Sequence, residues 1–398
     1  MIESIINSLE NTSRPSEQNI NRKDFFKTAG LGLLAVGASS CAPLISSRKG
    51  SAHRYQPKYH TIAHEFLDLE KEFGVTGADY RFLDSIIDKA KKKIEVKEQY
   101  SKDDAVQILE TIDSVLKEEG FSYKANGLLN YGLKTKKIDC DNYSVIYLAI
   151  AETLNLPIVG VDASDHFFVR WDPDGKHDAT NSPNKVNSFN WEITSAEVLS
   201  DDYYKSRFNI ADKSITNGVF LKSLNRDGVL SIQYSNRGIA WYKKGDLDKA
   251  IEDYNKAISL NPKYPGAYNN RGLAWYDKRY LNEAIEDFDE AIRLEPNNYA
   301  AHNNTGLVWA KRGKLDKAIE YYEQANILNP KKYGAHHNRG NALRHKGYLN
   351  EAIEAYDKAI RLNPKHADSY NNRGIIWEMK GEIDKANKDF RIAQRLNE

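Results

Sequence analysis

The chain has 398 residues, enough for two or three domains, and its 57 basic and 56 acidic residues leave a formal net charge of +1. This balance gives no global field that would attract nucleic acid, so we expect no nucleic-acid partner. The two cysteines, Cys41 and Cys140, lack the Cys/His spacing of zinc sites. His60 and His64 share a helical face without a carboxylate between them, which favours a solvated face over a metal site. We expect neither a metal nor a cofactor.

The first 40 residues have the layout of an export signal. Basic residues at positions 22, 23 and 27 precede a weakly apolar run over residues 29–38, which is too short and too rich in glycine to cross a bilayer. The stretch resembles a twin-arginine signal in which Lys23 replaces the second arginine, so ordinary secretion stays an alternative route. Residues 38–41 resemble a lipoprotein box, with Ala38 where leucine is commoner.

The lipoprotein resemblance implies that Cys41 is the lipidated first residue of the mature protein. Such a protein would be anchored to a membrane of the cell envelope, on its periplasmic or extracytoplasmic side. Two alternatives are an ordinary cleaved signal with an incidental cysteine and an uncleaved amino-terminal anchor. Residues 41–62 are predicted to be a tether, because most of this range lacks hydrophobic periodicity.

Residues 63–205 are predicted to form one α+β domain. Three helical patterns come first, over residues 60–73, 79–96 and 101–119. A fourth helix, over residues 143–154, is apolar on most of its faces, as a buried helix should be, with Asp139 as a plausible N-cap. Strand composition follows over residues 158–161, 167–171 and 189–194.

The fourth helix and the strands after it bring together residues that suit nucleophilic catalysis. Cys140 falls in the first turn of the helix, where unpaired N–H groups and the helix dipole favour a thiolate. A cysteine nucleophile needs an imidazole to take its proton, and His166 opens the second strand. Asn190 and Glu192 lie two residues apart on the third strand, so both face the same side and alternation does not choose between them. The alternative is an inert buried thiol and a core histidine.

This stretch resembles the transglutaminase-like superfamily, and within it a bacterial subgroup. The matching positions are Cys140, Ser144, Tyr147, Leu148, Ile150, Ala151, Glu152, Leu154, Leu156, Pro157 and the run from His166 to Arg170. The resemblance covers about residues 63–205 and implies a cysteine-protease-like α+β fold. It favours Glu192 as the third catalytic residue, with Asn190 next. The backbone N–H of Cys140 would hold the oxyanion, with Asn130 or Tyr131 as weak candidates for a second donor.

From Ser231 onward the sequence repeats with a 34-residue period. Glycine, an aromatic residue, alanine and proline return at the same positions of each unit, so the units are identified as tetratricopeptide repeats. Five repeats fit, over residues 231–264, 265–298, 299–332, 333–366 and 367–398. Stacked repeats form an all-α solenoid with a concave groove, and such grooves usually hold a protein or peptide partner. Residues 206–230 are predicted to be a helical bridge to this solenoid.

Positions on the first helix of each repeat predict which side chains face the groove. Asn269, Tyr276, Asn303 and Asn371 are the candidates. A second asparagine position is filled in all five repeats and has two open interpretations, a contact to a partner or a hydrogen bond between helices. Its members are Asn236, Asn270, Asn304, Asn338 and Asn372.

The pattern as a whole favours a membrane-anchored thiol hydrolase, a protease or amidase, that carries a protein-binding arm. Cys140 would attack a peptide or side-chain amide and form a thioester, and an amine in place of water would make the protein an acyl transferase. The alternative is a catalytically inactive lipoprotein scaffold that binds proteins through its repeats.

Overall fold

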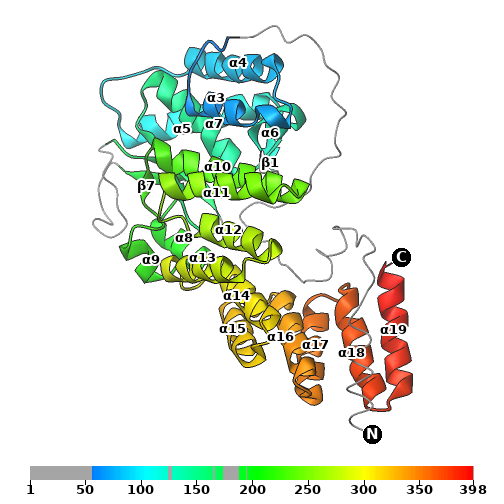
Figure 1. Cartoon of the computed structure of the whole chain (residues 1–398). Helices are drawn as coiled ribbons and strands as arrows, with labels where there is room; N and C mark the ends of the chain where they lie inside the picture. The colour runs from blue at the N-terminus through cyan, green and yellow to red at the C-terminus, as the bar shows by residue number, and fades with distance from the viewer. Residues whose placement is uncertain (1–55, 124–127, 165, 174–187, 194, 398) are drawn as a thin grey trace. The chain divides into compact units, whose positions relative to one another are not determined.

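In the computed structural model, the residues described are 56–123, 128–164, 166–173, 188–193 and 195–397 (Figure 1). Cys41 and the predicted export signal lie outside these residues. None of the helices within them is long and apolar enough to span a membrane. A boundary between two compact units falls after Leu328, so residues up to 328 and residues from 329 onward are described separately.

The α/β domain begins with helices α3 (Ile62–Leu69), α4 (Gly77–Lys93) and α5 (Lys102–Glu118), with a short 3-10 turn, η1 (Lys71–Phe73), after α3. Each α-helix starts at a Thr or Ser whose side chain forms a capping box with the third helical residue. In α3 that third residue is His64, which is buried and contacts both Thr61 and Asp84. The prediction that His64 lies on a solvated face was therefore wrong, because this face of α3 packs against α4.

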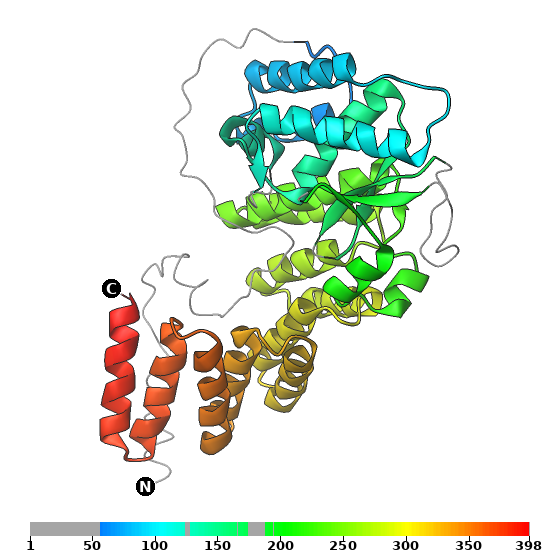
Figure 2. The same ribbon diagram turned by 180° about the vertical axis from the view of Figure 1, so that it is seen from behind.

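Five antiparallel strands form the main sheet, in the order β6-β5-β4-β3-β7. Figure 2 shows the longer strands of this sheet as green arrows. The five strands are β3 (Ile158–Asp162), β4 (Phe167–Trp171), β5 (Phe189–Glu192), β6 (Glu197–Leu199) and β7 (Ser223–Leu224). A separate parallel pair joins β1 (Ser122–Tyr123) to β2 (Lys137–Ile138), and helix α6 (Leu129–Thr135) lies between them in the chain. The three predicted strands are confirmed; β6 and β7 were not predicted, being too short to show a period of two.

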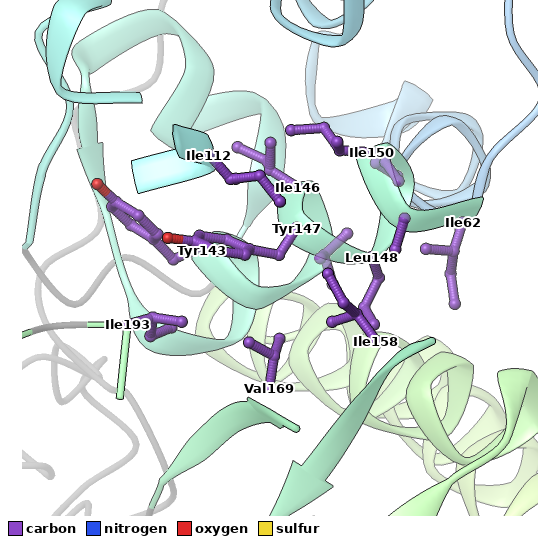
Figure 3. Packing of buried hydrophobic residues seen from close by; sticks show 14 of the residues in the cluster. Ile62, Ile112, Tyr143, Ile146, Tyr147, Leu148, Ile150, Ile158, Val169 and Ile193 are labelled. Atoms are coloured by element: carbon purple, nitrogen blue, oxygen red, sulfur yellow. The ribbon is translucent and has the colours of Figure 1, made fainter. Parts of the chain in front are cut away.

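Helix α7 (Cys140–Leu154) covers one face of this sheet. Successive side chains of β4 point to opposite faces of the sheet, so they show what packs on each face. Val169 packs with α7 in the larger core, to which α3, α4, α5 and the first repeat contribute. Figure 3 shows Tyr147 of α7 pointing toward Tyr143, with Leu148 beside Ile158 of β3. Phe168 points to the opposite face and joins a second core, formed with Tyr204 and Leu294 among others. Both faces of the sheet are thus buried.

The segment predicted as a helical bridge, residues 206–230, is only partly helical. It contains the end of α8 (Asp201–Arg207), the five-residue α9 (Asp212–Thr216), strand β7 and the start of α10. The backbone N–H of Leu221 donates to the carbonyl of Asp162, and β7 then pairs with β3. The prediction missed this strand because it adds to the sheet edge through backbone contacts that sequence periodicity does not reveal.

The repeats form helix pairs. In the first unit these are α10 (Arg226–Lys244) with α11 (Leu247–Leu260), α12 (Pro265–Asp277) with α13 (Leu281–Leu294), and α14 (Tyr299–Lys311) with α15 (Leu315–Leu328). In the second they are α16 (Tyr333–His345) with α17 (Leu349–Leu362) and α18 (Ala367–Met379) with α19 (Ile383–Asn397). A Cβ on Gly272 would lie 2.7 Å from the ring of Phe288, so the repeated glycine gives the repeated aromatic its space.

The first repeat packs into the core of the α/β domain. Helix α10 has 19 residues where α12 has 13, and its added first residues place Val229 in the larger core, which Ile232 of the same helix also joins. Further along, Gln233 donates to the buried carboxylate of Glu70 at 2.5 Å. The second repeat also contacts the domain, since Ser214 Oγ donates to the carbonyl of Leu294 at 2.7 Å.

Candidate active site

Cys140 is held by the elements on either side of it. Ile138 of β2 is buried, and Asp139 caps α7 by accepting the backbone N–H of Asn142 at 3.0 Å. These contacts fix the chain where it enters the helix, so that Cys140 becomes the first helical residue. Its exposed fraction is 6%. The sequence predicted this position for the cysteine.

The electrostatic surroundings of the thiol differ from the expected ones. Burial raises the pKa of Cys140 well above the usual range, and the neighbouring carboxylates of Asp141 and Asp139 raise it further. The thiol donates to Asp141 Oδ1 at 3.5 Å, which also favours the protonated form. Desolvation and two acidic neighbours therefore act against the helix dipole, and these surroundings favour the thiol over the expected thiolate.

His166 and Glu192 are brought together, as the sequence predicted for a histidine and its orienting acid. His166 Nε2 lies 2.7 Å from Glu192 Oε2, and both side chains are largely buried. The hydroxyl of Tyr204, on α8, donates to the same carboxylate oxygen at 3.0 Å. The imidazole also stacks on Phe208, with ring centroids 5.5 Å apart. Ring and carboxylate are thus both held from the α8 side of the sheet.

Asn190 faces the same side of β5 but has other partners. Its side-chain oxygen accepts from Arg170 Nε at 2.6 Å, and its amide donates to Asp201 at 2.8 Å. Arg170 is fully buried and also donates to Asp201, at 2.7 Å. Asn190 therefore belongs to a buried polar network that holds α8 against the sheet. The geometry favours Glu192, rather than Asn190, as the partner of His166.

The start of β4 links Cys140 to the residue that follows His166. A backbone hydrogen bond from Phe167, the residue after His166, reaches the Cys140 sulfur and lowers its pKa. Ser144, one turn into α7, donates to the Phe167 carbonyl at 3.4 Å. Among the described residues, Cys140 has no hydrogen bond to the His166 ring itself. Catalytic hydrogen bonds often form only when substrate binds, so the lack of this bond is compatible with a catalytic pair.

Asn130 and Tyr131, the weak candidates for an oxyanion donor, lie on α6. The amide of Asn130 donates to the carbonyl of Phe73 at 3.1 Å, so this group already has a partner. Tyr131 is half-buried. The backbone N–H of Cys140, at the start of α7, remains the donor that the helix geometry suggests. No group of side chains suited to hold a metal ion occurs in the described parts of the chain.

The predicted groove residues fall into two classes. Asn269 and Asn303 are buried inside the first unit, where Asn269 accepts from Asn304 at 3.0 Å. Tyr276 is half-buried, and Asn371, in the C-terminal unit, is exposed. Tyr276 and Asn371 therefore stay candidates for contact with a partner. Because Asn269 and Asn303 are buried, they contribute to the packing between helices of the repeats.

The second asparagine position mostly joins neighbouring repeats. Asn270 donates to Ser235 at 3.4 Å, and Asn372 donates to Asn341 at 2.9 Å. Asn236 differs, since it donates to Asp141 beside the cysteine, at 3.0 Å. Of the two interpretations left open by the sequence, a hydrogen bond between helices is the one seen for these three residues.

Three residues of the site were missed by sequence reasoning: Tyr204, Asp141 and Asn236. Asp141 could have been noticed, since it follows the cysteine directly and a charge there must act on the thiol. Tyr204 gave no local signal, and Asn236 was noticed only as one of the repeated asparagines. They reach the site from elements that follow it by 12 or more residues and meet it only in the folded chain.

Comparison with known families assigns both parts of the chain. A family model described as Transglutaminase-like superfamily matches residues 80–220. Models described as TPR repeat and Tetratricopeptide repeat match residues 238–278, 340–381 and 270–332. The chain therefore contains a transglutaminase-like domain followed by a helical array of tetratricopeptide repeats, and the predicted fold class is confirmed.

Individual relatives match only parts of the chain. The TPR repeat-containing thioredoxin TTL4 of Arabidopsis thaliana is 31% identical over 93 residues, and the chain spans only 13% of its length. A crystal structure of MamA is 28% identical, with 40% of this chain and 94% of that chain covered and a TM-score of 0.37. The TPR protein YrrB, described as having an unusual peptide-binding site, is 26% identical, with 42% and 86% covered and a TM-score of 0.35. Pseudomonas aeruginosa PilF is 17% identical, with 43% and 78% covered and a TM-score of 0.41.

Proposed function

Because the chain joins a transglutaminase-like domain to tetratricopeptide repeats, we propose that it is a thiol hydrolase acting on peptide or side-chain amides, with Cys140 as nucleophile, His166 as base and Glu192 as orienting acid. The observation that supports this most is the 2.7 Å contact between His166 and Glu192, one residue away from the Phe167 backbone that reaches the sulfur. His166 lies next to the residue whose backbone contacts the thiol, so its carboxylate partner is in a position to orient a base for Cys140.

In the first step, the Cys140 sulfur attacks the amide carbonyl carbon while the thiol proton passes to His166. Because burial and the two aspartates raise the pKa of the thiol, this transfer would accompany attack instead of preceding it. Glu192 holds Nε2, so Nδ1 would be the nitrogen that takes the proton. The backbone N–H at the start of α7 would stabilise the oxyanion.

In the second step, the carbon–nitrogen bond breaks and His166 returns the proton to the leaving amine. Cys140 is left as a thioester. Water, giving a proton to His166, then attacks the thioester. The carbon–sulfur bond breaks, the acid leaves, and the proton returns to the Cys140 sulfur, which makes the protein a protease or amidase. An amine in place of water would give an acyl transfer. Hydrolysis is the proposed outcome, in line with the resemblance stated from the sequence.

We also propose that the protein is exported and lipidated on Cys41, which would tether it to a membrane of the cell envelope. This proposal is supported by the residues before Cys41, a basic stretch and a short apolar run that ends in small residues. The repeats would bind a protein or peptide partner, for which Tyr276 and Asn371 are candidate contacts. The partner would bring substrate to the thiol.

The test is to trap the thioester. Full-length protein is incubated with a set of peptides and glutamine-containing proteins, quenched in acid, and digested for mass spectrometry of the Cys140 peptide. An acyl adduct on Cys140 that is lost in His166→Ala, and that hydroxylamine releases, is the expected result. Because the adduct carries the acyl part of the substrate, it would identify reaction and substrate class together. A matched control is Cys140→Ser.

The second candidate is an inactive scaffold, and the buried, acid-flanked thiol is the observation that favours it. A scaffold would capture its partner equally well after Cys140→Ala and would form no adduct. Absence of an adduct, together with partner capture unchanged by Cys140→Ala, would overturn the proposal of catalysis.

A further inference from the structure

Asp141 is placed between the candidate nucleophile and the repeat array. One carboxylate oxygen, Oδ1, accepts the Cys140 thiol at 3.5 Å, and the other, Oδ2, accepts the amide of Asn236 at 3.0 Å. Asp141 and Asn236 are 3% and 5% exposed. Two buried contacts thus connect the sulfur, through a single carboxylate, to the first repeat.

Asn236 makes this contact because it belongs to the first repeat. In the next repeat the equivalent Asn270 reaches back to Ser235, on the first helix of the preceding repeat. Asn304 reaches back to Asn269 in the same way. In the described part of the chain no repeat precedes α10, and the first turn of α7 accepts this contact instead. The α/β domain therefore acts as the preceding neighbour of the array.

The charges that surround Asp141 come from several elements. Asp139, the cap of α7, raises the pKa of Asp141 in addition to the larger effect of burial, whereas Asn236, Cys140 and His166 lower it. Tyr123, on β1, interacts with the thiol and with both aspartates. Asn236 is the contact to Asp141 that comes from the repeats. It favours the ionised carboxylate by donating to it.

We propose that Asn236 is a positioning residue: it holds Asp141 and shares its negative charge, and in this way it sets how readily the Cys140 thiol gives up its proton. This inference rests on the proposed role of Cys140 as nucleophile. It makes the first tetratricopeptide repeat part of the site, so that any partner or change that shifts α10 changes the reactivity of the thiol.

The direction of the effect follows from hydrogen bonding. Without the Asn236 amide, the Asp141 carboxylate has one donor fewer and becomes a stronger acceptor for the thiol proton. The thiol then loses its proton at higher pH. Asn236→Ala should therefore slow alkylation of Cys140 about three- to tenfold below the thiol pKa, because only the thiolate reacts. Asp141→Asn, which removes the charge, should speed it.

The experiment measures the rate of iodoacetamide alkylation of Cys140 against pH in the full chain, with peptide mass spectrometry to separate Cys140 from Cys41. Wild type is compared with Asn236→Ala, Asp141→Asn and the double variant. If Asn236 acts through Asp141, Asn236→Ala shifts the profile upward in the wild-type background and leaves it unshifted in Asp141→Asn. Slow access of iodoacetamide to the buried thiol would limit this measurement. Thiolate absorbance in the ultraviolet, with Cys140→Ala as blank, gives the same titration without the reagent.

Asn270→Ala is the matched control, because it removes the same amide from the second repeat without touching Asp141. Its profile should match that of wild type. A profile unchanged by Asn236→Ala, or shifted equally in both backgrounds, would overturn the proposal. The readout is independent of turnover. Failure to trap a thioester would instead count against the proposed function and leave this titration result standing.

Discussion

At the scale of single residues, Asn190 and Glu192 illustrate how surroundings assign a role that position does not. They lie on one face of β5, two residues apart, and each has a side chain able to orient an imidazole. The register of β5 against β4 pairs Asn190 with Arg170. Arg170 needs buried acceptors, so Asn190 is used by the arginine network and Glu192 meets His166.

This difference predicts the effect of altering the acid. Glu192→Gln should lower the rate of Cys140 acylation by an activated ester by about two to four orders of magnitude, since the imidazole loses its orienting charge. Tyr204→Phe removes only the hydroxyl that supports Glu192 and should cost about tenfold or less. Intact-mass kinetics of acylation measure both. If Asn190→Ala kept the fold and was the more damaging change, Asn190 would replace Glu192 as the third residue.

Glu70 predicts a pH dependence of stability. Its fully buried carboxylate accepts the backbone N–H groups of Leu129 and Asn130 and the side chain of Gln233, and burial raises its pKa to about 7 from 4.5. A raised pKa in the folded state means that the folded chain holds a proton which the unfolded chain releases. Stability from this group is therefore complete below pH 4.5 and is lost as the pH rises to about 7.

The loss is at most about 3 kcal/mol. It should be seen as a decrease in the free energy of urea unfolding between these pH values. Glu70→Gln cannot titrate and should lack this component of the slope. An identical pH dependence in wild type and Glu70→Gln would show that Glu70 keeps its charge when folded.

At the scale of the element, each repeat is two helices that approach closely because one residue has no side chain. A Cβ on Gly272 would meet Phe288 at 2.7 Å, well inside contact distance, and the other repeats show the same pairing. Glycine and the aromatic residue therefore recur with the same period in the sequence because they contact each other between the paired helices.

Gly272→Ala should destabilise the second repeat by about 1–3 kcal/mol, because the added methyl group forces the Phe288 ring to move. Phe288→Leu makes room for that methyl group. The double variant should therefore be less destabilised than the sum of the single changes predicts. Thermal unfolding of the four proteins gives this comparison. Strict additivity would mean that the two residues do not share the space.

An ion pair also joins the two helices of this repeat. Arg271 donates through two nitrogens to Asp287, whose side chain is 6% exposed. Arg271→Ala would leave this carboxylate buried without its guanidinium and should cost about 1–3 kcal/mol. Arg293, which pairs with Glu290 on the surface of α13, is the matched control. Arg293→Ala should leave the unfolding midpoint unchanged.

At the scale of the whole molecule, the boundary between compact units does not follow the boundary between fold classes. The first three repeats belong with the α/β domain, and the last two form the C-terminal unit. Helix α10 attaches the first repeat to the α/β domain, since it supplies core residues and donates hydrogen bonds to Glu70 and Asp141. The first three repeats and the α/β domain thus form one compact unit.

Two truncations test separately what the last two repeats and what helix α10 contribute to the stability of the α/β domain. A chain that ends at Leu328 should remain folded and keep the Cys140 alkylation profile, because every contact of Asp141 and Glu70 described above is retained. A chain that ends at Asn225 lacks α10 and should be insoluble or lose cooperative unfolding, since the core loses Val229 and Ile232. Circular dichroism and size-exclusion chromatography check both. A folded, monomeric Asn225 chain would show that the domain does not need the repeat.

The sequence by itself determined the repeats, the four helices and three strands that dominate the α/β domain, and the position of Cys140. These depend on periodicity and on caps that act over a few residues, which one chain displays directly. Only the tertiary structure decided that Glu192 meets His166, that the thiol is buried between carboxylates, and that Asn236 reaches Asp141. Such contacts depend on register and packing between distant segments, and no local pattern encodes them.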